Sequence, residues 1–264
     1  MMRLIFSDID GTLINSDFLV TPRTKEAIRR VVDQGNCFIP ISARMPEAIK
    51  PIIDSIGITS PIISYNGALL QDENDETIAS SPMTTAQALE LCQLIENETP
   101  EIVWNIYSYH DWYAKDRSDY WIKREENIVG VVAKEAALSS LTGLGEVHKV
   151  LLMGDPEKIG PLEVDLKKRY PDLSIAKSAP YFIEIMARGI RKGHAVEVFT
   201  AYMGLSLADT MAFGDNFNDL DMLQTVGKAY VMSNGPKEVQ EAIGHVTADH
   251  DHDGIAQILE RDVL

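Results

Sequence analysis

The sequence has few cysteines and few basic residues for its acidic content. Its two cysteines, Cys37 and Cys92, show neither metal-ligand nor redox spacing, so we expect both to be buried small hydrophobic side chains. Lysines and arginines number 24 against 40 aspartates and glutamates, giving a formal net charge of -16. This balance excludes a general nucleic-acid binder, because affinity for phosphate backbones comes from clustered cations.

A long apolar run near the start is also missing. The first run meets Ser7 and Asp8 after only Leu4, Ile5 and Phe6. A signal-peptide core needs roughly 7–15 apolar residues and a membrane helix about 20. We therefore expect no membrane partner and a location in the reducing cytoplasm.

The remaining composition is that of an ordinary folded protein. Hydrophobic residues make up 45% and charged residues 24% of the 264 positions, and no stretch is rich enough in proline, glycine or serine to predict disorder. The length allows either one large domain or a catalytic domain that carries a smaller second one.

The first 65 residues alternate short apolar runs with amphipathic stretches. Helix boundaries are marked by Thr21 as a cap, Pro22 at the first helical position and Gly35 as a stop. The pattern predicts βαβαβ organisation with parallel strands. The predicted elements are Leu4–Ser7, 22–34, 37–42, 46–56 and Ile62–Tyr65.

The same alternation returns near the C-terminus, but the middle of the chain differs. The late elements are predicted at 192–203, 210–213, 217–224, 228–232 and 236–243. Between them, aromatic strand-like pieces alternate with two helical stretches, 84–96 and 156–169, and all three tryptophans lie there. We interpret the chain as α/β, with a Rossmann-like parallel-sheet core domain of residues 1–81 and 187–264. An α+β cap domain, 82–186, is inserted after a hairpin at Ala68–Ser80, and one continuous α/β domain is the alternative.

Two aspartates, Asp8 and Asp10, directly follow the first predicted strand. Ligands of open parallel sheets bind beyond the carboxyl ends of the strands. An aspartate can accept a phosphoryl group, and a second carboxylate two residues on can handle the leaving group's proton. Gly11 allows a tight turn there. Taken alone, the pair also fits a solvated turn.

A second acidic strand end occurs at Asp215, Asn218 and Asp219. Two such ends can share one Mg²⁺, which takes carboxylates, waters and substrate phosphate as ligands. Asp8, Asp215 and the main-chain carbonyl of Asp10 would suffice. Without an ion, these carboxylates would repel a phosphate strongly. The alternative is two separate exposed acidic turns.

Three further segments have groups that suit phosphate. Lys192 precedes a helical pattern, where a cation is unfavourable unless it and the helix N-terminus converge on an anion. Ser42 and Ala43 follow the second strand, beside Asp8 if the two strands are neighbours. Asn66-Gly67 follows the third strand. The simpler interpretations are a solvated lysine, a serine helix cap and an ordinary turn.

These motifs together resemble the haloacid dehalogenase-like superfamily, and within it the Cof-type phosphatases of subclass IIB with a large α/β cap. Phe6-Ser7-Asp8-Ile9-Asp10-Gly11-Thr12-Leu13 resembles motif one, Ser42 motif two, Lys192 motif three and Gly214-Asp215-Asn216-x-Asn218-Asp219 motif four. The resemblance runs from Asp8 to Asp253-Gly254 and implies Mg²⁺ as the cofactor.

The resemblance also implies a role for each motif residue. Asp8 would be the nucleophile and Asp10 the general acid and base. The phosphate binders would include Ser42, Ala43, Asn66, Gly67, Lys192 and Asn218. The metal ligands would be Asp8, Asp10, Asp215 and Asp219, with Asn218 and Asp219 also steadying Lys192, water and metal. Asp10 favours phosphoryl chemistry, because the dehalogenases lack this second acid.

Two departures from the family pattern concern the shape of the pocket rather than its catalytic groups. Ala43 stands where glycine is usual, and Ser233-Asn234-Gly235 stands where Gly-Asn-Ala is frequent. The expected function is a magnesium-dependent phosphatase of a small phosphorylated metabolite. A sugar phosphomutase and a catalytically idle regulator that binds Mg²⁺ and phosphate are the alternatives. The aromatic residues of the insert fit either its hydrophobic core or a leaving-group pocket: Trp104, Tyr107, Trp112, Tyr113 and Tyr181.

Overall fold

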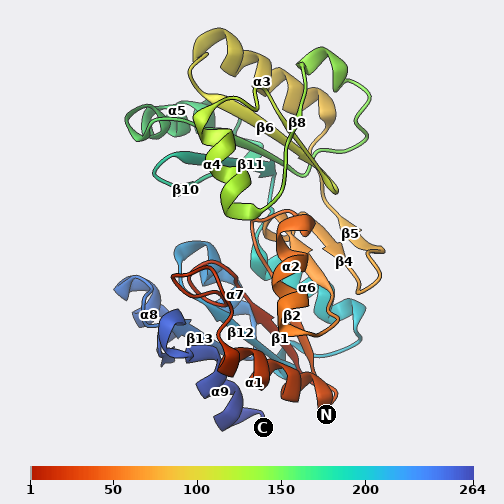
Figure 1. The fold of residues 1–264 in the computed structure, drawn as a ribbon, viewed down its shortest axis with the longest axis vertical. Coiled ribbons are helices and arrows are strands. Elements are labelled where there is room, and N and C mark those ends of the chain that lie inside the picture. Colours follow the sequence, from red (N-terminus) through yellow and green to blue (C-terminus); the bar gives the residue numbers. More distant parts are fainter. Residues whose placement is uncertain (1) are drawn as a thin grey trace. The chain divides into compact units, whose positions relative to one another are not determined.

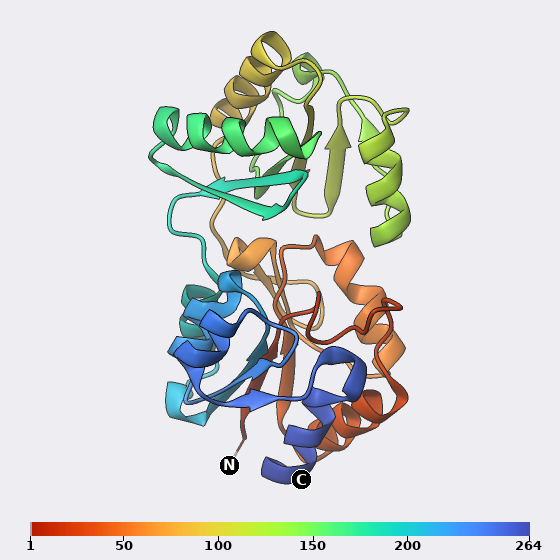
Figure 2. The ribbon, with the colours of Figure 1, turned by 90° about the vertical axis from the view of Figure 1, so that its left-hand side faces the viewer.

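The computed structural model describes residues 2–264, and the chain divides into two compact units (Figures 1 and 2). The core unit consists of the chain up to Ser80 together with Arg191–Leu264, and the cap unit is Ser81–Ile190. The limits of 82 and 186 expected for the insertion lie within four residues of this division.

The core unit contains a five-stranded sheet in which every neighbouring pair is parallel. The strand order is β14-β13-β12-β1-β2. The strands are β1 (Leu4–Ser7), β2 (Cys37–Pro40), β12 (Thr210–Gly214), β13 (Lys228–Met232) and β14 (Val246–Thr247). Because β1 lies between β12 and β2, the segments that follow these three strands meet at one edge of the sheet.

Helices cover both faces of this sheet. Ile5 and Phe213 pack with α1, α2 and α9 on one face, while Leu4 and Phe6 pack with α6, α7 and α8 on the other. Figure 1 shows α1 and α9 side by side. The helices are α1 (Pro22–Asp33), α2 (Pro46–Ile56), α6 (Lys192–Tyr202), α7 (Leu220–Thr225), α8 (Lys237–Ile243) and α9 (Gly254–Asp262). This is the doubly wound α/β arrangement that the alternating pattern predicts.

The start of α1 follows the expected capping chemistry. The Thr21 side chain accepts a hydrogen bond from the N–H of Thr24, and Pro22 occupies the first turn. After the core strands, β3 (Ile62–Ser64), β4 (Leu69–Gln71) and β5 (Thr77–Ser80) form a small antiparallel sheet, with β4 and β5 as the expected hairpin. A parallel bridge between Ile41 and Ile63 connects it to the main sheet.

The cap unit contains a six-stranded sheet in the order β10-β11-β9-β6-β7-β8. Its pairs are antiparallel except β7 with β8. The helices α3 (Thr85–Glu98) and α5 (Pro156–Arg169) cover one face with a continuous apolar cluster. The strands are β6 (Val103–Ser108), β7 (Asp111–Ala114), β8 (Lys134–Glu135), β9 (Lys149–Met153), β10 (Leu173–Ala179) and β11 (Phe182–Ala187).

The structure corrects four details of the sequence interpretation. A third cap helix, α4 (Tyr120–Val129), contains Trp121, and α9 is a further helix beyond the last predicted element, 236–243. The stretch 217–224 begins with a 3-10 turn, Phe217–Asp219, before α7. Cys37 is half-buried instead of fully buried, because it opens β2 at the sheet margin.

Among residues 2–264, no helix combines the length and the apolar character that crossing a membrane would require.

Candidate active site

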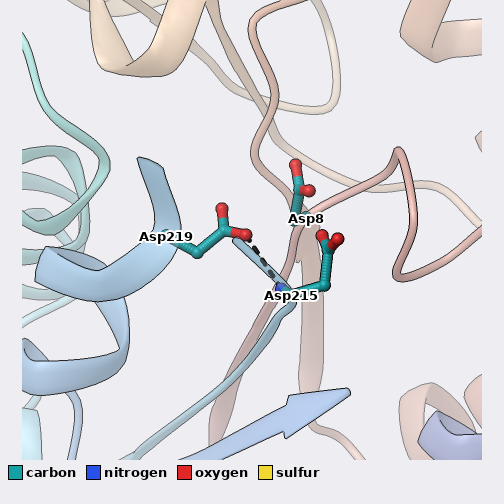
Figure 3. Close-up of side chains that lie close together, drawn as sticks. All are labelled: Asp8, Asp215 and Asp219. Carbon is teal, nitrogen blue, oxygen red and sulfur yellow. Dashed lines mark hydrogen bonds between the residues drawn. The ribbon is translucent and has the colours of Figure 1, made fainter. Parts of the chain in front are cut away.

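Two acidic segments from opposite ends of the chain meet at the carboxyl edge of the core sheet. Asp8 follows β1 and Asp215 follows β12, and the N–H of Asp8 donates to the carbonyl of Phe213 at 3.0 Å. One carboxylate oxygen from each of Asp8, Asp215 and Asp219 lies within 4.8 Å of the others (Figure 3). The fold therefore brings together the two acidic strand ends that the sequence left open as separate turns.

Lys192 is the buried cation of this cluster. It is the first residue of α6 and is 1% exposed. Its Nζ lies 2.6 Å from Oδ1 of Asp8 and 2.6 Å from Oδ1 of Asp219. Burial alone would lower the pKa of Lys192, but the carboxylates of Asp219 and Asp8 outweigh it and hold that pKa above its ordinary value. The ammonium therefore stays charged.

Asp219 is fully buried, and both of its oxygens accept hydrogen bonds. Oδ1 accepts from Lys192, while Oδ2 accepts the main-chain N–H groups of Asp215 at 2.9 Å and Asn216 at 3.0 Å. The dashed line in Figure 3 marks the bond to Asp215. Asp219 thus fixes the turn after β12 and the position of the lysine, and its oxygens are already committed to these donors.

The cluster holds more negative than positive charge. Burial, and then the neighbouring Asp219, raise the pKa of Asp8 well above its ordinary range, although Lys192 acts in the opposite direction. Burial and Asp219 also raise the pKa of Asp215 to about 6. Three carboxylates face one ammonium, and hard oxygen donors of this kind suit a divalent cation such as Mg²⁺. The residues present therefore fit that ion.

A glycine and two polar side chains surround Asp215 and the turn beside it. Gly11 has φ +79°, and a Cβ there would lie 2.6 Å from Oδ2 of Asp215. The Thr12 hydroxyl donates to Oδ1 of Asp215 at 3.1 Å. Asn234 donates from Nδ2 to the Gly11 carbonyl at 2.9 Å. The sequence interpretation assigned no role to Thr12 or Asn234, although Thr12 lies within motif one and Asn234 within a noted departure from the family pattern.

Asp10 is not one of the three converging carboxylates. Its side chain is 52% exposed and forms a two-pronged ion pair with Arg44. Nε of Arg44 donates to Oδ2 at 2.9 Å, and Nη2 donates to Oδ1 at 2.6 Å. A metal contact through the Asp10 carboxylate therefore has no support in this arrangement, and one through its main-chain carbonyl stays a prediction. Arg44 has no assigned role in the sequence interpretation, although its charge directly follows Ala43.

The predicted phosphate-binding turns after β2 and β3 are joined to each other. Ser42 is buried, its hydroxyl accepts from the N–H of Arg44 at 3.2 Å, and its carbonyl accepts from the N–H of Asn66 at 2.8 Å. Ala43 lies between Ser42 and Arg44 and is half-buried. Asp8 follows β1 and Ser42 follows β2. The two strands pair in the sheet, so they are neighbours, as expected from the sequence.

Gly67 has a packing reason that is independent of any ligand. Its φ is +104°, and a Cβ there would lie 2.7 Å from the Cβ of Ala195 at the start of α6. This position therefore requires glycine, because a larger residue would collide with α6, the helix that begins with Lys192. Asn218 is exposed within the 3-10 turn, one residue before Asp219.

Comparison with known proteins defines the class of protein to which this chain belongs. The sequence profile of the haloacid dehalogenase-like hydrolases matches residues 5–259. The chain belongs to this family, and the resemblance inferred from the motifs is confirmed.

Similar proteins match along nearly the whole chain. A Haemophilus influenzae protein, provisionally named a phosphatase, is 36% identical over 260 residues, covering 98% of both chains. The HMP-PP phosphatase of Serratia proteamaculans is 26% identical over 252 residues, covering 93% of this chain and 91% of its own. The crystal structure of a haloacid dehalogenase-like hydrolase from Bacteroides thetaiotaomicron superposes with a TM-score of 0.91, 26% identity and 99% coverage of both chains. The chain is thus a phosphatase of the family, a hydrolase of phosphoric monoesters.

Proposed function

We propose that this protein is a magnesium-dependent phosphatase that hydrolyses a small phosphomonoester, a sugar phosphate or a similar metabolite, through an aspartyl-phosphate on Asp8. One observation carries the proposal: the buried Asp8 carboxylate converges with Asp215 and contacts the Lys192 ammonium at 2.6 Å. A nucleophile, a cation for the phosphoryl oxygens and a set of metal-type ligands thus occupy one sheet edge.

Asp8 and Asp215, with the main-chain carbonyl of Asp10, would hold the Mg²⁺. When bound, the ion would neutralise charge on the phosphoryl oxygens and polarise the phosphorus centre. We assign Asp219 to a supporting position, because Lys192 and two main-chain N–H groups already occupy its oxygens. The surplus of negative charge in the cluster supports a metal site, since burial and then repulsion by Asp219 raise the pKa of Asp8, and a bound cation would offset that repulsion.

In the first step an Asp8 oxygen attacks the phosphorus. The bond from phosphorus to the leaving oxygen breaks, the electron pair stays on that oxygen, and Asp10 supplies its proton. Lys192 and the Ser42 hydroxyl, with Ala43, Asn66, Gly67 and Asn218 nearby, would hold the phosphoryl group in line. Positioning and charge stabilisation dominate such transfers.

In the second step water attacks the aspartyl-phosphate. Asp10, now a carboxylate, takes a proton from the water as the new oxygen–phosphorus bond forms. The bond between phosphorus and the Asp8 oxygen breaks, which releases phosphate and restores the Asp8 carboxylate. Asp10 thereby returns to its protonated form, and the cycle closes without a further reactant.

We place this reaction in the cytoplasm, since the two cysteines form no disulfide within residues 2–264.

The replacement Asp8→Asn tests the proposal. We expect Mg²⁺-dependent hydrolysis of 4-nitrophenyl phosphate to disappear while the thermal midpoint stays close to that of the wild type. Asp33→Asn, which alters an exposed aspartate at the end of α1, is the matched control and should keep full activity. Substantial hydrolysis by Asp8→Asn, purified free of other phosphatases, contradicts the proposal. Release of inorganic phosphate by the wild type separates hydrolysis from transfer between sugars and excludes an idle regulator.

A further inference from the structure

A two-pronged ion pair outside the acidic cluster joins Arg44 to Asp10. Arg44 uses one edge of its guanidinium, Nε and Nη2, to bind both oxygens of Asp10 at 2.9 and 2.6 Å. A fork of this kind fixes the plane and direction of a carboxylate, which a single ammonium contact does not. The Asp10 side chain is 52% exposed, whereas that of Arg44 is only 12% exposed. The buried partner therefore holds the exposed one.

The main chain at Arg44 is itself anchored. Its N–H donates to the Ser42 hydroxyl at 3.2 Å, and its carbonyl accepts from the N–H of Tyr65 at 3.2 Å. The carbonyl of Ser42 in turn accepts from the N–H of Asn66. Arg44 thus extends from a turn that is tied to the next strand end, and it reaches across to the turn after β1. This is the construction expected of a support for another side chain.

We propose that Arg44 is a positioning residue that aims the Asp10 carboxyl group at the leaving oxygen. The inference rests on the proposed function, because it presumes that Asp10 transfers the proton. A short side chain that is half in solvent would otherwise sample several rotamers, and misplacement by about 1 Å can reduce a rate about 10²-fold. Arg44 gains no covalent role and receives no proton in this scheme.

A second possible role for Arg44 is direct binding of the substrate phosphate, and the two roles predict different kinetics. A phosphate-binding arginine contributes equally to all phosphomonoesters, whatever alcohol departs. A residue that acts through the general acid matters only where the leaving oxygen needs a proton. Aryl phosphates separate the two cases, because their leaving groups differ in basicity while their shapes stay similar.

The experiment measures kcat/KM with Mg²⁺ for phenyl, 4-nitrophenyl and 2,4-dinitrophenyl phosphate in the wild type, Arg44→Gln, Arg44→Lys and Asp10→Asn. We expect Arg44→Gln to lose about 10²-fold on phenyl phosphate and only a few-fold on the dinitrophenyl ester. Arg44→Lys should recover part of the loss, since an ammonium restores the charge but not the fork. Adding Arg44→Gln to Asp10→Asn should cause little further loss.

The matched control is Arg23→Gln. Arg23 also holds a carboxylate with two prongs, from Nε to Oε1 of Glu260 at 3.1 Å and from Nη2 to Oε2 at 2.6 Å, in the same unit but on α1. It should leave all three esters unchanged. An equal loss of kcat/KM on all three esters in Arg44→Gln, or a double variant that loses the product of both single losses, overturns the inference.

Failure of the underlying function gives a different result. If Asp10→Asn shows no dependence on the leaving group, the general-acid assignment itself is wrong. If the wild type hydrolyses none of the three esters, the proposed function fails, and the inference about Arg44 fails with it. A normal Asp10→Asn result combined with an unaffected Arg44→Gln contradicts the positioning role alone.

Discussion

The core unit and the cap unit both pack helices against a sheet, but they bury their charged groups in different ways. In the core unit, Asp8, Lys192 and Asp219 are buried at one edge of the sheet, where carboxylates outnumber the single ammonium. In the cap unit, Lys149 and Glu184 lie on neighbouring strands of one sheet, with Nζ and Oε1 3.8 Å apart. The core unit has unbalanced charge, whereas this pair in the cap unit is balanced one to one.

Strand β6 shows how the cap unit separates apolar from polar groups. Trp104 and Ile106 belong to the apolar cluster under α3 and α5, so Asn105 and Tyr107 point to the opposite face. There the Lys149 ammonium lies 4.6 Å from the centre of the Tyr107 ring. The comparison teaches that burial of charge alone does not identify a site. An excess of carboxylates over ammonium groups, as at Asp8 and Lys192, favours a bound cation. One lysine paired with one glutamate does not.

The sharpest test of this difference replaces one buried lysine in each unit. Lys192→Met and Lys149→Met should each lower the free energy of unfolding by about 3–5 kcal/mol, because each removes an ammonium that contacts a buried carboxylate. Only Lys192→Met should also lower kcat for 4-nitrophenyl phosphate, by about 10²–10³-fold. Denaturant unfolding and steady-state kinetics measure the two effects. Equal kinetic losses in both variants would remove the distinction between the units.

The metal-free core unit should become less stable as the pH rises from about 4 to 6. The pKa of Asp215 is about 6 in the folded state, above its ordinary 3.8, so the folded state binds more protons in this window. Asp8 acts in the same direction. The expected loss is about 3 kcal/mol for Asp215. Hydrogen exchange of the β1 and β12 amides in EDTA measures it, and Mg²⁺ should abolish the trend.

The cap unit should respond to pH in the opposite direction. Burial lowers the pKa of His148 to about 4 from its ordinary 6.5, and its Nδ1 accepts the N–H of Tyr109 at 3.1 Å, which requires that nitrogen to be unprotonated. The unfolded state therefore binds more protons between these values, and stability falls by up to about 3 kcal/mol as the pH drops from 6.5 to 4. Exchange of the β6 and β9 amides measures this, and His148→Gln should flatten the curve. Parallel trends in both units would refute the comparison.

A smaller effect separates two glycines with similar backbone angles. Gly11 and Gly130 have φ of +79° and +70°, but only a Cβ at Gly11 meets an atom within 4 Å, Oδ2 of Asp215 at 2.6 Å. Gly130→Ala should cost about 1 kcal/mol of strain alone, and Gly11→Ala about 1–3 kcal/mol. Only Gly11→Ala should weaken Mg²⁺ binding, measured by titration calorimetry. Unchanged Mg²⁺ affinity in Gly11→Ala would show that Asp215 is not a ligand.

Local chemistry explains which parts of the fold the sequence could predict. The alternation of apolar runs and the marks at Thr21, Pro22 and Gly35 specify β1, α1 and β2 without tertiary information. Helix α4 was not predicted although Tyr120–Val129 is amphipathic, because the helix is short and buries only Ile122 among its residues. Its cap, Asp119, is a local signal that aromatic strand-like neighbours obscured.

The candidate site was predictable in its members but not in their contacts. Motif spacing places Asp8, Lys192 and Asp215 at strand and helix ends, and the parallel sheet makes these ends converge. Two further features could not be predicted: both oxygens of Asp219 accept hydrogen bonds, and Arg44 forms an ion pair with Asp10. Both depend on side-chain directions across long loops, which no local pattern encodes.

Direct detection of the phosphoryl group on Asp8 tests the central claim most directly. Asp10→Asn protein, which should hydrolyse the intermediate slowly, is mixed with 2,4-dinitrophenyl phosphate and Mg²⁺, quenched in acid and digested for mass spectrometry. We predict the added mass of one phosphoryl group on the peptide that contains Asp8, and none when EDTA replaces Mg²⁺. Turnover in which this peptide stays unmodified, or carries the group on another residue, would contradict the account.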